Sequence, residues 1–203
     1  MKTHKTVSPR AIAATAMMGA ASAVLMLLSF PMPFLIPGFI KMDFSELPAL
    51  IASFALGPWW GVLVCLIKNL INVTMTTTGG VGELANFLLG AAFVLPAGYL
   101  YRFKKNRVGA LWGSIAGAVA SAVLSFPINL FITYPFYAAT MIPMETIVGM
   151  YSALLPSVDT LEECLLIFNL PFTLLKGTIV TGMTFLVYKP LSVLIKGKKE
   201  SRS

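Results

Sequence analysis

The stretch VGALWGSIAGAVASAVLSFPINLFITYPFY, residues 108–137, carries no charged side chain. A helix needs roughly 20 predominantly apolar residues to cross the hydrocarbon core of a bilayer, and this stretch exceeds that length. The whole chain agrees, because 57% of its 203 residues are apolar and 11% are charged, against about 45–50% and about 25% in a soluble domain. A soluble fold of this size has too little interior to hide so much apolar surface. We therefore predict an all-α integral membrane protein embedded in the lipid bilayer.

Together with residues 108–137, the other apolar stretches predict six transmembrane helices in a single domain covering residues 1–203. Their approximate ranges are 9–30, 45–56, 59–74, 82–102, 108–137 and 163–195. Prolines and glycines mark several ends, such as Pro31 after the first helix and Gly57-Pro58 between the second and third. Residues 138–162 mix prolines with acidic residues, so we predict a long loop there, of the kind that often forms a functional lid.

The charged residues predict the orientation of these helices. With the N-terminus inside the cell, twelve of the 15 basic residues fall on inner segments, as the positive-inside rule expects: Lys2, Lys5, Arg10, Arg102, Lys104, Lys105, Arg107, Lys189, Lys196, Lys198, Lys199 and Arg202. Seven of the eight acidic residues fall on the outer side: Asp43, Glu46, Glu83, Glu145, Asp159, Glu162 and Glu163. We therefore predict a multi-pass protein of the cell membrane with both termini in the cytoplasm.

Three lysines do not fit the inner segments: Lys41, Lys68 and Lys176. A lysine at the middle of a bilayer costs about 3 kcal/mol on insertion scales, so it usually faces the bundle interior or water. Lys68 shares its stretch with Asn69 and Asn72. For this group, pocket lining and hydrogen bonding between helices remain equally good interpretations.

Two predicted helices carry a row of polar side chains at the spacing of one helix face. These are Ser125, Asn129 and Thr133 in the fifth helix, and Asn169, Thr173 and Lys176 in the sixth. Two such rows predict a shared polar pocket in the outer half of the membrane. Hydrogen bonds between helices, worth about 1 kcal/mol each, are the alternative. We favour that alternative for Ser125 and Thr133, and ligand binding for Asn129 and Lys176.

Small residues form stripes on two predicted helices, which allows another helix to approach closely. The stripes are Ala13, Ala16, Ala20 and Ala23 in the first helix, and Gly109, Gly113 and Gly117 in the fifth. We interpret the glycines as intramolecular packing. For the alanines, the pattern alone leaves open whether a partner subunit is involved.

Signatures of enzymes are missing from the sequence. No P-loop is present, so any ATP-driven activity must come from a partner. The single histidine, His4, lies in the basic N-terminal segment, and Cys65 and Cys164 lie far apart with no metal-ligand spacing. We therefore expect no catalytic residue, metal or cofactor. The basic residues gather at predicted membrane boundaries, so nucleic acid is not an expected partner.

Several short motifs occur in a specific order along nearly the whole chain. They are Ala16-x-x-x-Ala20, Phe30-Pro-x-Pro-Phe34, Met42-Asp-Phe-Ser-Glu-Leu-Pro48, Gly57-Pro58, Lys68-Asn-x-x-Asn72, Ala85-Asn-Phe-Leu88 and Pro171-Phe-x-x-x-Lys176-Gly177. With these motifs, the chain resembles the substrate-binding S-components of energy-coupling factor (ECF) vitamin transporters, and specifically their riboflavin-binding branch. The resemblance implies six helices that enclose one vitamin near the extracellular side.

The resemblance also implies partners. They would be a transmembrane coupling subunit and two cytoplasmic ATPases, with riboflavin as transported substrate rather than cofactor. Ala16 and Ala20 would face the coupling subunit. The alternatives are an S-component for another vitamin, such as thiamine or a pyridine, and a membrane protein without a transport function.

Site residues carry over from the resemblance onto matching positions. Asn129, Thr173 and Lys176 would bind the ribityl chain. Thr173 stands where riboflavin binders tend to carry asparagine, and Asn169 one turn earlier would compensate. The isoalloxazine ring would be bordered by Phe39, Ile40, Lys41, Met42, Asp43 and Glu46.

Overall fold

The computed structural model describes the backbone of residues 8–196 and the side chains of residues 8–187. The basic residues Lys2, Lys5, Lys198, Lys199 and Arg202, together with His4, lie outside the described residues, as do the side chains of Lys189 and Lys196. The predicted cytoplasmic location of both termini therefore stays a prediction.

Four helical stretches within the described residues are long and apolar enough to span a membrane. The first two are α1 (Pro9–Leu27) and α4 (Val81–Phe103). The third runs through α5 (Arg107–Ile128), the π-helical turn η1 (Asn129–Thr133) and α6 (Tyr134–Thr140). The fourth runs through α8 (Leu161–Cys164), the π-helical turn η2 (Leu165–Asn169) and α9 (Leu170–Lys196).

Two further apolar helices are shorter: α2 (Glu46–Ala55) has 10 residues and α3 (Pro58–Val73) has 16. At about 1.5 Å per residue, α2 is roughly half as long as the hydrocarbon core is thick. Gly57 joins them with a φ of 128°, a value that glycine adopts readily, and Pro58 begins α3 at a position that needs no N–H donor. The six predicted helices therefore correspond to four long stretches and two short ones, with ends that differ by a few residues.

A short antiparallel pair of strands closes the connection between α1 and α2. Strand β1 (Phe30–Pro31) pairs with β2 (Lys41–Met42), so that Phe30 lies opposite Met42 and Pro31 opposite Lys41. The prolines predicted irregular backbone here, and the strand pair is an addition that the sequence pattern did not indicate. It fixes the segment that leads into Asp43 and α2.

The predicted loop at residues 138–162 is partly wrong, because it contains the helix α7 (Met144–Ser152). Ile147 and Tyr151 lie one helical turn apart and are buried, as is Val158 after the helix. One face of α7 is therefore packed on the bundle, and residues 144–158 form a folded cap rather than an open loop.

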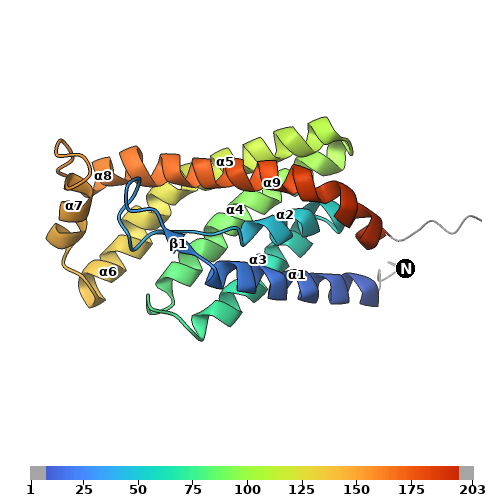
Figure 1. Cartoon of the computed structure of the whole chain (residues 1–203), viewed down its shortest axis with the longest axis horizontal. Helices are drawn as coiled ribbons and strands as arrows, with labels where there is room; N and C mark the ends of the chain where they lie inside the picture. Colours follow the sequence, from blue (N-terminus) through green and yellow to red (C-terminus); the bar gives the residue numbers. More distant parts are fainter. Residues whose placement is uncertain (1–7, 197–203) are drawn as a thin grey trace, which may run out of the picture.

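The arrangement of these elements is visible in Figure 1. The start of α1 and the end of α9 lie at one end of the bundle, and α7 and α8 lie at the other, beside the connection that follows β1. Between these ends, α4 packs on α5 and α5 packs on α9, while α1 packs on α3.

The small residues serve two different purposes. A Cβ atom at Gly113 would lie 2.6 Å from the carbonyl oxygen of Ala97, and one at Gly117 would lie 2.1 Å from that of Phe93. These glycines therefore allow α5 to approach α4 closely, as the sequence interpretation expects. On α1, Ala16 and Ala20 are exposed, whereas Ala23 is buried.

Candidate functional site

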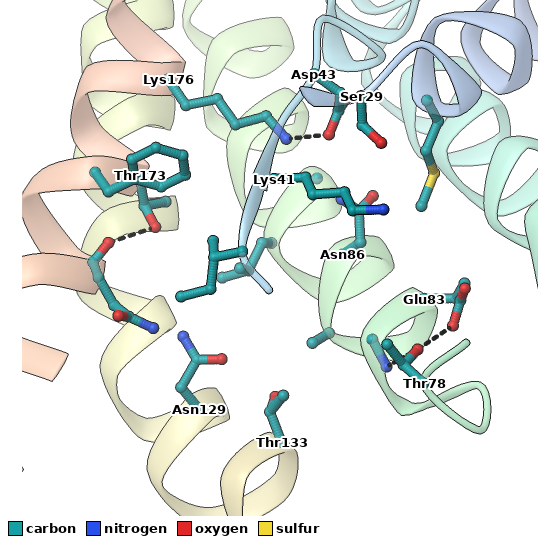
Figure 2. A pocket seen from close by; sticks show the side chains of 18 of the residues that line it. Ser29, Lys41, Asp43, Thr78, Glu83, Asn86, Asn129, Thr133, Thr173 and Lys176 are labelled. Carbon is teal, nitrogen blue, oxygen red and sulfur yellow. Dashed lines mark hydrogen bonds and ion pairs between the residues drawn. The ribbon is translucent and has the colours of Figure 1, made fainter. Parts of the chain in front are cut away.

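A cavity of about 400 Å³ lies among the helices, and Figure 2 shows it from close by. This volume falls within the roughly 300–1,000 Å³ of typical small-molecule sites. Its walls come from the end of α1, the connection between β1 and α2, the facing sides of α3 and α4, the run from α5 to α6, and the run from η2 to α9.

The structure places all of the predicted substrate-binding residues except Met42 at this cavity. They are Phe39, Ile40, Lys41, Asp43, Glu46, Asn129, Asn169, Thr173 and Lys176. Met42 is 2% exposed and instead packs in a buried apolar cluster with Ile36 and Tyr134. Successive side chains of a strand point to opposite faces, so β2 directs Lys41 to the cavity and Met42 away from it.

Four charged side chains meet beside the cavity, and we call them the ion cluster: Asp43, Glu46, Lys68 and Lys176. Lys176 Nζ lies 2.9 Å from Asp43 Oδ2 and 3.0 Å from Glu46 Oε2. Lys68 Nζ lies 2.8 Å from Glu46 Oε1. Figure 2 shows Lys176 reaching from α9 to Asp43. Two ammonium groups therefore face two carboxylates, and the cluster has no net formal charge.

The acids of the ion cluster, Asp43 and Glu46, are buried, at 5% and 7% exposure. A charge taken out of water needs a partner of opposite sign, which explains why Lys68 and Lys176 lie beside these acids. Lys68, whose role the sequence left open, links α3 to α2 through Glu46 and also donates to Ser45 Oγ at 2.5 Å.

Lys176 keeps donor capacity for a ligand despite its two ion pairs. An ammonium group has three N–H donors. Asp43 accepts a hydrogen bond from one of them, Glu46 forms an ion pair with the ammonium group, and Lys176 lines the cavity. A donor therefore remains for an acceptor atom inside the cavity.

A second polar group beside the cavity is neutral, and we call it the hydroxyl–amide ring: Tyr134, Tyr151 and Asn169. Asn169 Nδ2 donates to the Tyr134 hydroxyl at 2.9 Å, and the Tyr151 hydroxyl donates to Asn169 Oδ1 at 2.6 Å. The two tyrosine hydroxyls are also hydrogen-bonded to each other. Burial raises the pKa of Tyr151 above its ordinary value, so its hydroxyl stays protonated and can donate.

The two π-helical turns, η1 and η2, carry cavity residues at their ends. Asn129 and Thr133 lie in η1, and Asn169 is the last residue of η2. Turns of this kind are frequent at functional sites because the extra residue per turn redirects side chains. The spacing of a regular helix assigned Ser125 to the same row, but its hydroxyl donates to Ala122 O in its own helix at 2.6 Å.

The wall formed by α4 was missed as a binding surface. Asn86 lines the cavity, and its buried Oδ1 has no hydrogen-bond partner among the described residues. Glu83 also lines it and accepts hydrogen bonds from Thr76 at 2.8 Å and Thr78 at 2.9 Å. Figure 2 shows these groups across the cavity from Thr173 and Lys176, with Lys41 extending between them. The signal available in the sequence was Asn86 within the motif Ala85-Asn-Phe-Leu88.

Apolar side chains complete the cavity between its polar groups. They are contributed mainly by Phe39, Ile40, Leu89, Phe93 and Phe172. The ring of Phe39 meets Tyr134 and Tyr151 edge-on, with centroid distances of 6.2 and 6.3 Å. The site therefore combines an apolar slot with directed hydrogen-bonding groups, which is the composition of a small-molecule site.

A cavity with polar and apolar walls, enclosed by helices long and apolar enough to span a membrane, places the chain in the class of membrane proteins that bind a small solute. The family model for the substrate-specific component of ECF transporters matches residues 10–188. The chain belongs to this family, whose members are transporter components rather than enzymes.

Individual relatives agree with the family. The chain is 32% identical over 180 residues to the riboflavin transporter RibU of Staphylococcus aureus (strain TCH60), covering 89% of each sequence. It is 30% identical over 188 residues to the riboflavin transporter FmnP of Bacillus subtilis (strain 168), covering 91% of this chain and 93% of the relative. A solved structure of the S component of a bacterial ECF transporter superposes with a TM-score of 0.71 at 29% identity, covering 92% of this chain and 98% of that one.

Proposed function

We propose that this protein captures riboflavin from outside the cell and delivers it to the cytoplasm as the substrate-specific component of an ECF-type importer. Riboflavin is a flat aromatic ring with a polyol tail, so its site needs an apolar slot and a few directed hydrogen bonds. The cavity carries this combination, and this observation supports the proposal most directly. The names of the relatives at 30% and 32% identity point to the same substrate.

The residues divide between the two parts of the ligand. Asn129, Thr173 and Lys176 bind the ribityl chain, and Asn169 lies one turn from Thr173 in the same wall. Phe39 and Ile40 border the isoalloxazine ring, with Lys41 beside them. Asp43 and Glu46 act on the ligand through Lys176, because their carboxylates fix its ammonium group.

Delivery requires partners that supply energy. A transmembrane coupling subunit docks on the exposed Ala16 and Ala20 of α1, where small side chains allow close helix packing. Two cytoplasmic ATPases hydrolyse ATP and drive release. In this arrangement both termini face the cytoplasm, and the end of the bundle with α7 and α8 faces outward.

Docking is tested with Ala16→Leu and Ala20→Leu, with Ala21→Leu, at an exposed alanine outside the stripe, as the control. Co-purification with the coupling subunit should be lost in the first two variants, while riboflavin binding stays unchanged because α1 contributes to the cavity only at its end. Retained co-purification would contradict the docking role.

The substrate is tested with the purified protein in detergent. Flavins absorb visible light and fluoresce, so bound riboflavin is detected by a yellow colour and by quenched fluorescence on titration. Riboflavin should bind, and an excess of thiamine or pyridoxine should not displace it. Binding of thiamine or pyridoxine in place of riboflavin would overturn the substrate assignment. Absence of any vitamin binding, with no ATPase co-purifying, would overturn the transport role.

A further inference from the structure

We propose that Tyr151 in α7 is a positioning residue for the ligand site, because its hydroxyl fixes the orientation of the Asn169 amide. This inference rests on the proposed riboflavin site and assigns a role in it to residues 138–162. Tyr151 lies behind the cavity wall and is 0% exposed, whereas its partners Tyr134 and Asn169 line the cavity.

Helix α7 is held firmly enough to act in this way. Ile147 and Val158 are buried with Tyr151 in the apolar cluster that contains Met42 and Phe172. The ring of Tyr151 also packs on Phe168, with centroids 5.4 Å apart. The Tyr151 hydroxyl therefore has a fixed position relative to η2.

The hydrogen bond from Tyr151 to Asn169 Oδ1 fixes the direction of the other two bonds in the hydroxyl–amide ring. Each tyrosine hydroxyl has one proton to donate. Tyr151 donates its proton to Asn169 Oδ1. Its bond with Tyr134 must therefore use the proton of Tyr134, which in turn accepts from Asn169 Nδ2. The three bonds form one closed cycle in which each group donates once and accepts once, and such cycles reinforce themselves.

This direction determines what Asn169 presents to a ligand. Its Oδ1 is held by α7, and one of its two Nδ2 hydrogens is bound to Tyr134. The remaining Nδ2 hydrogen is a donor for the cavity. Asn169 therefore recognises an acceptor on the ligand, such as a carbonyl or hydroxyl oxygen. Without the Tyr151 hydroxyl, Oδ1 loses its donor and the amide is held only through its bond to Tyr134, so the amide plane is no longer fixed.

The test is Tyr151→Phe, which removes the hydroxyl and keeps the ring that packs on Phe39 and Phe168. Riboflavin affinity, measured by fluorescence titration, should fall by about tenfold. In an Asn169→Ala background, the same substitution should change affinity by less than about twofold, because the group through which it acts is gone.

Ser152→Ala is the matched control. It removes a hydroxyl from the same helix, where Ser152 Oγ donates to Val158 O at 2.6 Å, but this hydroxyl is no part of the ring. Its riboflavin affinity should stay within about twofold of the wild type. An equal loss in Ser152→Ala would show that α7 contributes only by packing and would overturn the inference.

Two further results would overturn it. One is unchanged affinity in Tyr151→Phe, and the other is a full additional loss from Tyr151→Phe in the Asn169→Ala background. In both cases the wild type still binds riboflavin, so the proposed function stands. A wild type that binds no riboflavin would remove the proposed function and this inference together.

Discussion

The ion cluster and the hydroxyl–amide ring both hold the segment from η2 to α9 in place beside the cavity. The first does so by ion pairs and the second by hydrogen bonds between neutral groups. The cluster uses four charged groups from α2, α3, α9 and the connection before α2. The ring uses three neutral groups from η2, α6 and α7. Breaking a buried ion pair by removing one partner costs about 3–5 kcal/mol, whereas an unsatisfied neutral group costs about 1–3 kcal/mol. The ion cluster therefore contributes more to the stability of the fold. The hydroxyl–amide ring orients the Asn169 amide, and breaking it costs less free energy.

The largest expected effect is on stability, from Lys68→Met in the ion cluster. The free energy of unfolding should fall by about 3–5 kcal/mol, because Glu46 loses a partner while remaining buried. Combining Lys68→Met with Glu46→Gln should restore part of this loss, since Asp43 and Lys176 then remain as a neutral pair. Denaturant unfolding in detergent measures both variants. Equal destabilisation of the single and double variants would show that Lys68 acts through packing alone.

The next effect is on ligand binding, from Lys176→Ala. Riboflavin affinity should fall by more than about tenfold, because the cavity loses a donor and the Asp43 carboxylate loses its ion-pair partner. Fluorescence titration measures the change in a variant shown to be folded by its unfolding curve. Affinity equal to that of the wild type would remove Lys176 from the site.

A smaller loss of stability is expected from Tyr134→Phe in the hydroxyl–amide ring. Two hydrogen bonds are lost without a change of shape, so the free energy of unfolding should fall by about 1–2 kcal/mol. A loss as large as that of Lys68→Met would reverse the comparison and make the ring the main anchor of the fold.

The smallest expected effect is on ligand binding, and it distinguishes Asn86 from Asn69. The buried Oδ1 atom of each has no hydrogen-bond partner among the described residues. Asn86 lines the cavity, while Asn69 is buried on α3 and does not line it. Asn86→Ala should lower riboflavin affinity by about fivefold, if one neutral hydrogen bond of about 1 kcal/mol is lost. Asn69→Ala should leave affinity unchanged. Equal effects would place both residues in the fold rather than in the site.

Features that follow from local spacing were the most predictable from the sequence. The polar row of Asn169, Thr173 and Lys176 shares one wall of the cavity, because regular helical spacing continues from the end of η2 into α9. The turn at Gly57-Pro58 was likewise predictable, since glycine tolerates the positive φ of this turn and proline fixes its own φ.

Features that depend on distant partners were not predictable. Nothing in the neighbourhood of Lys68 indicates that Glu46, 22 positions away, is its partner. The row through Ser125 did not indicate its partner, because the Ser125 hydroxyl donates to Ala122 O in its own helix rather than to another helix. The role of Tyr151 depends on its hydrogen bond to the Asn169 amide in η2. The prolines and acidic residues around Tyr151 instead predicted a loop.

The riboflavin site is tested most directly by a riboflavin titration of three proteins: wild type, Asn129→Ala and Thr178→Ala. Asn129 lines the cavity from η1, whereas Thr178 is exposed on α9 and donates to Leu174 O in its own helix. We predict one bound riboflavin per wild-type chain. We also predict an affinity lowered by more than about tenfold in Asn129→Ala and within about twofold of wild type in Thr178→Ala. Wild-type affinity in Asn129→Ala would contradict the assignment of the cavity between η1 and α9 as the riboflavin site.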